Sequence, residues 1–398
     1  VNGVYFNNNG ANRGGAIATF RGGRLTVHDS DFYQNSANGW EENVDPNFPI
    51  FSGGGALYHD FADTVELSNT NFSYNSATAG PGGAMALYHG TEVLLDSIVI
   101  RNNSSTGGGG GLCLLRPENV IFNHGVIMDN RSDWNSGGGV FFGTEASQDT
   151  VDMPGTFNRL LFVNNWALYG GGGFFIWNAT LDLYNSTFTM NEANDDNGSS
   201  GWQGGGLSIH SQSTANILNT IFYDNFPNSI HDGTPGSGFD INYSLTEEFW
   251  NGENNSYETD PLFVDVDSYD FRLQTGSPCI DVGTSDLDGD GVQDYFDFNG
   301  AAPDLGAIEW MVGAPELLNS FVDEQDSSVI LTWNAVVSDD LQYYRLQRSS
   351  DSLFSNIDDE NFVTDITYTD GDVEWNQEYF YRVSAYLGYW TEQSNTTS

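Results

Sequence analysis

The aspartates of DLDGDGVQDYFD, residues 286–297, form the clearest chemical pattern in the sequence. They fall where a twelve-residue calcium-binding loop carries its oxygen ligands, and Gly291 falls where such a loop turns sharply. Packing so many carboxylates into one turn is costly without a cation. The sequence therefore predicts a structural calcium site. Its candidate ligands are Asp286, Asp288, Asp290, the backbone carbonyl of Val292, Asp294 and Asp297.

This loop differs from a regulatory calcium-binding loop in two respects. Its last position is Asp297 instead of the usual bidentate glutamate, and no helical pattern flanks it. It looks more like the calcium-loop repeats of extracellular proteins. The alternative interpretation is a solvated acidic turn that holds no metal. In both interpretations we expect a structural role and no catalytic one.

Four tryptophans form a second candidate site. They all lie between a recurring asparagine and the next glycine pair of the repeat described below, so stacked repeats would place them along one edge. Aromatic rings with nearby Asp and Asn suit a neutral glycan or another surface protein as partner. The alternative is that each ring folds over its own loop and shields the backbone. The residues are Trp40, Trp134, Trp166 and Trp202.

The sequence offers little for catalysis. Its six histidines lack the spacing of a zinc site, and no G-x-S-x-G motif occurs. The adjacent carboxylates of NDD, residues 194–196, could serve glycoside hydrolysis, but neighbouring side chains in an extended loop usually diverge. We therefore assign no catalytic residue. The alternative function is a carbohydrate-active enzyme, a polysaccharide hydrolase or lyase that uses loop carboxylates.

The two cysteines leave a structural question open. Cys113 and Cys279 are the only cysteines in the chain. They can form one disulfide or remain as two buried thiols, and the sequence does not decide between these states.

The elements that position these residues follow from a repeat of about 27 residues. A small residue follows each glycine pair, at Ala16, Ala56, Ala84, Gly111, Gly139, Gly173 and Gly206. An asparagine closes each unit, at Asn9, Asn35, Asn75, Asn102, Asn130, Asn165, Asn191 and Asn225. An apolar residue stands three positions earlier, at Phe6, Phe32, Phe72, Val99, Ile127, Phe162, Phe188 and Phe222.

Such a repeat predicts an all-β solenoid. Each unit contains short strand-like pieces separated by turn residues and no helical stretch, which fits one coil of a right-handed parallel β-helix. Residues 1–225 would form about eight three-strand coils. Stacked asparagine amides can bond to the residues above and below, whereas stacked aspartates would repel. Glycines suit a bend where a side chain would crowd the next coil.

The repeats resemble a known family. GGAI (14–17), GGAL (54–57) and GGAM (82–85), each followed by F-x-x-N, are similar to the repeats of polymorphic outer-membrane proteins. That resemblance implies a surface-exposed β-helix linked to adhesion. Residues 226–312 lose the repeat and resemble the closing segment of secreted bacterial β-helix proteins. We expect this segment, with Trp310 and the apolar LGAI before it, to cap the last coil.

A second domain follows at residues 313–398. Its strands alternate apolar and polar residues, as in an antiparallel sandwich. The segment resembles a fibronectin type III domain, with Trp333 at the position of the buried tryptophan and Tyr379 at the tyrosine corner. The resemblance implies a structural spacer.

Charge limits the partners. The formal net charge is −44, with 55 acidic and 11 basic residues. Such a surface repels nucleic acid and anionic membranes, and no apolar run is long enough to insert into a membrane. We therefore expect a secreted or cell-surface protein that is structural or adhesin-type and non-enzymatic. It would contact glycans or surface proteins, or self-associate into a filament-forming assembly.

Overall fold

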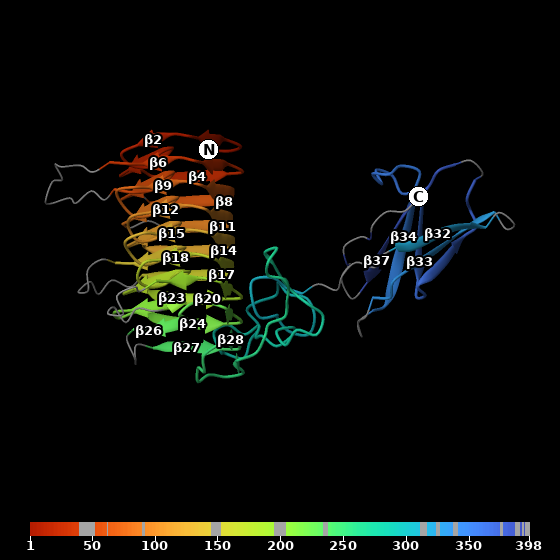
Figure 1. Cartoon of the computed structure of the whole chain (residues 1–398). Coiled ribbons are helices and arrows are strands. Elements are labelled where there is room, and N and C mark those ends of the chain that lie inside the picture. Colours follow the sequence, from red (N-terminus) through yellow and green to blue (C-terminus); the bar gives the residue numbers. More distant parts are fainter. Residues whose placement is uncertain are drawn as a thin grey trace. The chain divides into compact units, whose positions relative to one another are not determined.

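The computed structural model describes residues 1–39, 52–61, 63–89, 92–144, 153–194, 204–233, 238–310, 317–323, 327–336, 341–374, 377–386, 391 and 394. Within these ranges every regular element is a strand, and no helix is long and apolar enough to cross a membrane. The chain divides into two compact units, residues 1–309 and residues 310–398 (Figure 1). We refer to the first unit as the stacked body and to the second as the C-terminal unit.

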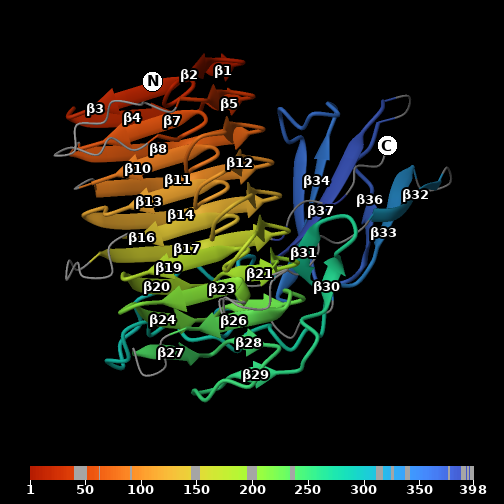
Figure 2. The same ribbon diagram turned by 60° about the vertical axis from the view of Figure 1, so that its left-hand side comes forward.

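The stacked body consists of long parallel sheets with 14, eight and seven strands. Each passage of the chain adds strands to the sheets in turn, so strands from successive repeats lie side by side (Figures 1 and 2). We call each passage a rung. The expected all-β class with stacked parallel strands is confirmed.

Strands recur at equivalent positions from rung to rung. The 14-stranded sheet contains β1 (Tyr5–Asn7), β4 (Arg24–His28), β5 (Asp31–Tyr33), β8 (Thr64–Ser73), β11 (Glu92–Arg101), β14 (Asn119–Met128), β17 (Pro154–Val163), β20 (Thr180–Tyr184), β21 (Thr187–Thr189), β24 (Thr214–Leu218), β25 (Ile221–Tyr223), β27 (Phe239–Asn242), β28 (Leu245–Thr246) and β29 (Ser256–Tyr257). The eight-stranded sheet contains β3 (Ile17–Phe20), β7 (Leu57–Asp60), β10 (Met85–Tyr88), β13 (Leu112–Leu115), β16 (Val140–Gly143), β19 (Phe174–Trp177), β23 (Gly204–His210) and β26 (Asn228–Asp232). The seven-stranded sheet contains β2 (Gly10–Ala11), β6 (Ser36–Ala37), β9 (Ser76–Ala77), β12 (Ser104–Ser105), β15 (Arg131–Ser132), β18 (Trp166–Ala167) and β22 (Glu192–Ala193).

The core of the stacked body is built from columns of apolar side chains. Parallel pairing places the repeated phenylalanines directly over one another, and Phe32 and Phe72 stack with ring centroids 4.6 Å apart. Both rings are fully buried. Because every rung contributes the same apolar positions, the core continues along the stack without a gap.

The asparagine ladder forms, but one predicted member is wrong. Asn75 donates from its side-chain Nδ2 to Oδ1 of Asn103 at 3.0 Å, and Asn103 donates in the same way to Asn130. Asn102, the predicted member, instead has a positive φ of 56°. Correspondingly Ile100, and not Val99, pairs with Phe72. Two adjacent asparagines made the choice ambiguous, and the strand register resolves it.

The first and the second glycine of a pair are required for different structural reasons. Gly82 has a φ of +69°, which favours glycine. At Gly83 a Cβ would lie 2.0 Å from the carbonyl oxygen of Gly110 on the next rung. The first glycine therefore makes the bend, and the second allows neighbouring rungs to approach.

The parallel pairing continues beyond residue 225. β24 pairs with β27, and β28 pairs with β29, so residues 239–257 add further strands to the 14-stranded sheet. The asparagine ladder ends at Asn225, whose backbone N–H lies 3.4 Å from Oε2 of Glu247. The same carboxylate oxygen accepts a hydrogen bond from the Ser229 hydroxyl at 2.6 Å. A carboxylate thus occupies the place of the next asparagine and closes the ladder.

The expected role of Trp310 in the cap is wrong. Trp310 belongs to the C-terminal unit and packs against its core. Trp250 instead packs against Phe239 of β27, with ring centroids 5.0 Å apart. The short antiparallel pair β30 (Phe263–Asp265) and β31 (Asp270–Leu273) follows.

After this pair the chain returns along the side of the stacked body. The backbone N–H of Gly306 donates to the carbonyl of Asn219 at 2.8 Å, and that of Ala307 donates to the Thr187 hydroxyl at 2.9 Å. The closing segment therefore contacts the β21 and β25 region as well as the last rung.

The C-terminal unit has two three-stranded antiparallel sheets around its own core. Trp333 is 1% exposed, as the sequence predicted for its tryptophan. Tyr381, and not Tyr379, is fully buried and donates its hydroxyl to Asp370 at 3.0 Å. The strands are β32 (Leu317–Asp323), β33 (Ser328–Trp333), β36 (Thr367–Asp370), β35 (Asp359–Val363), β34 (Tyr343–Ser349) and β37 (Phe380–Tyr386).

Candidate aromatic pocket and acidic loop

The outer face of the eight-stranded sheet is apolar over β10, β13, β16 and β19. Side chains alternate along a strand, so Leu112 and Leu114 of β13 enter the core while Cys113 and Leu115 point outward. Both outward side chains are nevertheless no more than 3% exposed. An outward face is usually polar, and an apolar one indicates packing or a binding surface.

Aromatic rings continue this outer face toward the C-terminal rungs. Strand register places Phe141 of β16 beside Phe175 of β19, with ring centroids 5.5 Å apart and planes 22° apart. Trp177, two residues along β19, stacks on His210 of β23 at 6.0 Å and 17°. Burial lowers the pKa of His210 to about 4, with a smaller contribution from His231. The ring is therefore neutral at ordinary pH and packs as an aromatic side chain.

A pocket of about 240 Å³ opens over these rings. It is lined by residues of β13, β16 and β19 and of the turns before β10, β13 and β16. Its lining combines aromatic and aliphatic side chains with one amide and two hydroxyl groups. The lining residues are Pro81, Gly107, Gly108, Cys113, Leu115, Asn135, Ser136, Phe141, Thr144, Phe175 and Trp177.

Only two of the predicted tryptophans lie in the described residues. Trp134 is 73% exposed and stands in the turn next to the pocket residue Asn135. Trp166 begins β18, where the guanidinium carbon of Arg131 lies 3.5 Å from its ring centroid. By register Trp166 pairs with Arg131 and Glu192, so it occupies a different position in the rung from Trp134.

These positions limit the predicted tryptophan row. Trp134 and Trp166 do not form a column, because the strand partners of Trp166 are not tryptophans. The positions of Trp40 and Trp202 are outside the described residues.

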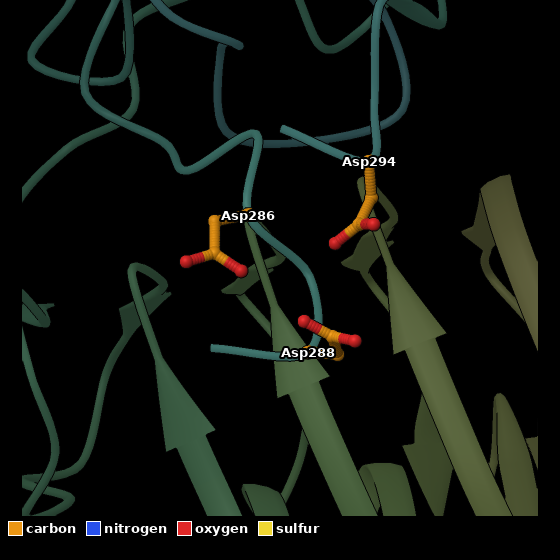
Figure 3. A group of neighbouring side chains, drawn as sticks. All are labelled: Asp286, Asp288 and Asp294. Carbon is orange, nitrogen blue, oxygen red and sulfur yellow. The ribbon is translucent and has the colours of Figure 1, made fainter. Parts of the chain in front are cut away.

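Three of the predicted calcium ligands converge. One carboxylate oxygen from each of Asp286, Asp288 and Asp294 lies within 4.8 Å of the other two (Figure 3). Asp286 accepts hydrogen bonds from the backbone N–H groups of Gly289 and Gly291, both at 2.8 Å. These bonds fold the loop so that its carboxylates face one another. Oxygen donors at this spacing fit a calcium ion.

Two other predicted ligands, Asp290 and Asp297, lie outside this group. Asp290 accepts a hydrogen bond from the backbone N–H of Val292 at 2.8 Å and is not part of the converging group. The Asp297 carboxylate lies 3.7 Å from Nε of Arg159 and 4.0 Å from Nε2 of His124. A cation at the three-carboxylate group would therefore complete its coordination with backbone oxygens or water.

Arg159 joins the acidic loop to β17. It donates to the hydroxyl of Tyr295 and to the backbone carbonyl of Asp297. Its Nη2 also lies 3.6 Å from Oε1 of Glu309, whose side chain is 7% exposed. Burial and the neighbouring Asp304 raise the pKa of Glu309 to about 8, although Arg159 acts in the opposite direction.

Two of the described histidines pair with carboxylates. His89 pairs with Asp60 and His124 with Asp96, both at 2.9 Å. Cys113 and Cys279 are both buried and are not joined to each other by a disulfide, which answers the question that the sequence left open. Burial raises the pKa of Cys279 to about 12, so its thiol stays protonated.

The pocket could have been suspected from the sequence. The four-residue strands LCLL (112–115) and FFIW (174–177) are apolar at every position, which indicates that both sheet faces are covered. This signal is independent of the glycine and asparagine repeat. The residues that close the pocket come from turns far apart in the sequence.

Comparison with known proteins gives limited information. No family model matches the sequence, and no curated protein matches it. Among solved structures the chain is similar to an Fn3-like protein from Clostridium thermocellum, at 30% identity and a TM-score of 0.19. That match covers 21% of this chain and 86% of the other.

Proposed function

We propose that this chain is a secreted or cell-surface protein of the adhesin type that contacts neutral glycans and catalyses no reaction. One observation carries the proposal: an outward sheet face holds Phe141, Phe175 and Trp177 around a pocket, with the exposed Trp134 in an adjacent turn. Aromatic rings pack well on the apolar faces of sugars. The net charge of −44 favours neutral over acidic glycans.

We further infer that the stacked body is a right-handed parallel β-helix of about eight coils, similar to the repeats of polymorphic outer-membrane proteins. The repeated register and the asparagine ladder support this inference. The C-terminal unit would be a fibronectin type III domain that acts as a spacer. Its two antiparallel sheets and the buried Trp333 support that assignment.

A glycan array at physiological salt tests the function. We expect binding to neutral glycans, and Trp134→Ala should weaken it about tenfold because an exposed stacking ring is lost. Trp166→Ala is the matched control, since Arg131 already covers a face of that ring. Turnover in a parallel screen of neutral and acidic polysaccharides, dependent on residues 193–203, would favour the alternative of a carbohydrate-active enzyme.

We also propose that calcium binds at Asp286, Asp288 and Asp294 and stabilises the closing segment. Convergence of three carboxylates supports this proposal. Millimolar calcium should raise the melting temperature relative to EDTA, and Asp288→Asn should remove most of that increase. Asp240→Asn, at an exposed position of β27, is the control. An equal calcium effect in wild type and Asp288→Asn would contradict the assignment.

A further inference from the structure

We propose that copies of this chain associate end to end, with the first rung of one stacked body docking on the acidic last rungs of another. We call residues 1–28 the head and residues 239–258 the tail, and β2 and β27 mark these two opposite ends of the stack (Figure 1). This inference is independent of the proposed glycan binding. It is carried by unpaired strand edges at the head, by an asparagine ladder that is open there, and by the charges of the two ends.

All three parallel sheets end in a strand with a free edge at the head. β1, β2 and β3 are the outermost strands of their sheets, and each pairs on one side only, with β5, β6 and β7. No strand in the described part of the chain covers their other side. Alternate residues of a parallel strand direct their N–H and C=O groups to opposite sides, so these edges present backbone groups outward. Such an edge is a template for another chain.

The apolar core is also open at the head. Phe6 stacks on Phe32 with ring centroids 4.6 Å apart, and among the described residues no other ring stacks on Phe6. Phe6 is partly exposed, whereas Phe32 is fully buried. Val4, Tyr5 and Phe20 are 38%, 60% and 46% exposed. A partner at this end would therefore bury apolar surface that a single copy leaves in water.

The asparagine ladder has a direction, and it is open at the head. Asn9 donates from Nδ2 to Oδ1 of Asn35 at 2.8 Å, and the later amides donate toward the tail in the same way. Among the described residues none donates to Oδ1 of Asn9. At the tail, Glu247 closes the ladder. A partner at the head would supply the missing donor, and the tail carries exposed amides at Asn251 and Asn254 that can donate.

The head and the tail differ in charge. Residues 1–28 contain three arginines and no acidic residue, whereas residues 239–258 contain five acidic residues and no basic one. Arg24 already forms an ion pair with Glu66 of β8. The head is therefore distinguished by its lack of carboxylates, which would repel an acidic partner. Its outward N–H groups can donate to carboxylates of the tail.

These charges favour a second copy as the partner. The net charge of −44 makes most faces of two copies repel each other. At physiological ionic strength, charges more than about 8 Å apart are largely screened, so the groups that meet at the contact decide the attraction. Every copy has one head and one tail, which makes the contact heterologous. Such contacts continue from copy to copy and produce an open filament when they do not close into a ring.

Sedimentation of the full chain at physiological salt, from about 1 μM to about 100 μM, tests the inference. We expect the mean mass to rise with concentration beyond that of a dimer. Tyr5→Glu places a carboxylate on β1 at the head and should weaken association roughly tenfold. Tyr74→Glu is the matched control, because Tyr74 is 50% exposed on an interior rung and, like Tyr5, contacts the ring of Tyr33. This control should associate like wild type.

A variant of the tail tests the direction of the contact. Asp240→Lys combined with Glu253→Lys reverses two exposed charges and should also weaken association roughly tenfold. Mixing this double variant with Tyr5→Glu should restore association, because one supplies an intact head and the other an intact tail. Asn7→Asp, another exposed change on β1, takes the place of Tyr5→Glu if that variant does not fold. Circular dichroism and melting temperature verify the fold of each variant.

The outcomes are distinct. Loss of association in the head and tail variants, with recovery on mixing, supports end-to-end docking. A monomer at every concentration, unchanged association of the folded head variant, or equal weakening in Tyr74→Glu would overturn docking at the head. If the tail variant associates like wild type, or if mixing restores nothing, the head does not dock on the tail and the inference is overturned. None of these results depends on glycans, so the proposed function stands or fails separately.

Discussion

Asn103 shows how a single side chain holds three rungs together. Its Nδ2 donates to Oδ1 of Asn130 and to the backbone carbonyl of Phe72, both at 3.0 Å. Its own Oδ1 accepts from the backbone N–H and the side chain of Asn75. With 1% of its surface exposed, the residue has no access to water that could replace these bonds.

Replacing this amide by a carboxylate should be severely destabilising. Asn103→Asp removes two donors and directs a negative charge at the oxygens of Asn130 and Phe72. The expected loss is roughly 3 kcal/mol or more of unfolding free energy, measured by urea denaturation. Asn102→Asp is the matched control, because this neighbouring residue lies outside the ladder. Equal losses in both variants would contradict the role of the ladder.

Glu309 should make stability depend on pH. Its pKa is raised from 4.5 to about 8, so between these values the folded chain binds a proton that the unfolded chain has released. The contribution of Glu309 to the free energy of unfolding is therefore greatest below pH 4.5, and it is lost as pH rises toward 8.

Glu309→Gln isolates this contribution, because glutamine stays neutral. Its melting temperature should exceed that of wild type increasingly as pH rises from 5 to 8.5 at constant ionic strength. Arg159, Asp297, Asp304 and Tyr295 remain around the site in both proteins. Glu118→Gln, at an exposed position, is the control. A difference that does not change with pH would refute the assignment.

At the scale of the strands and turns, close contact between glycines sets the spacing of neighbouring rungs. Gly110 lies where a Cβ would be 2.3 Å from the carbonyl oxygen of Gly138 and 2.5 Å from that of Arg131. Both contacts are to backbone of the next rung, which cannot rotate away as a side chain could. Even the methyl group of alanine therefore does not fit at this position unless the backbone shifts.

Gly110→Ala should lower the unfolding free energy by about 1–3 kcal/mol, because two rungs must separate to admit the methyl group. Thermal and urea unfolding would measure the change. At Gly23, the nearest atom to an added methyl group would be 4.0 Å away, so Gly23→Ala is the control. A stability of Gly110→Ala equal to that of wild type would contradict the close packing of rungs.

At the scale of the whole molecule, the two units have separate cores. The core of the C-terminal unit is built around Trp333, Tyr344 and Tyr381 and contains no residue of the stacked body. Residues 310–398 alone should therefore unfold cooperatively in thermal denaturation. Residues 1–309 alone should melt within a few degrees of their transition in the full chain. If the fragment of residues 310–398 showed no cooperative transition, its core would be insufficient for independent folding.

The sequence by itself determined the repeat, the all-β class and the acidic loop. These features depend on residue types at fixed spacing, such as the glycine pair before Ala84 or the alternation of Asp286 and Asp288. Each rung solves the same packing problem, so its residues recur and become visible without a structure. The sequence alone could not decide whether Asn102 or Asn103 belongs to the ladder, since both fit the repeat spacing within one residue.

Only the tertiary structure decided which positions meet across rungs. Pairing places Gly143 beside Trp177, although the two residues are 34 positions apart. Register likewise separates Trp166 from Trp134. Tertiary packing places the Asp297 carboxylate near Arg159 and Trp310 in the C-terminal unit. The reason is physical: turns between strands vary in length, and backbone pairing alone fixes which side chains become neighbours.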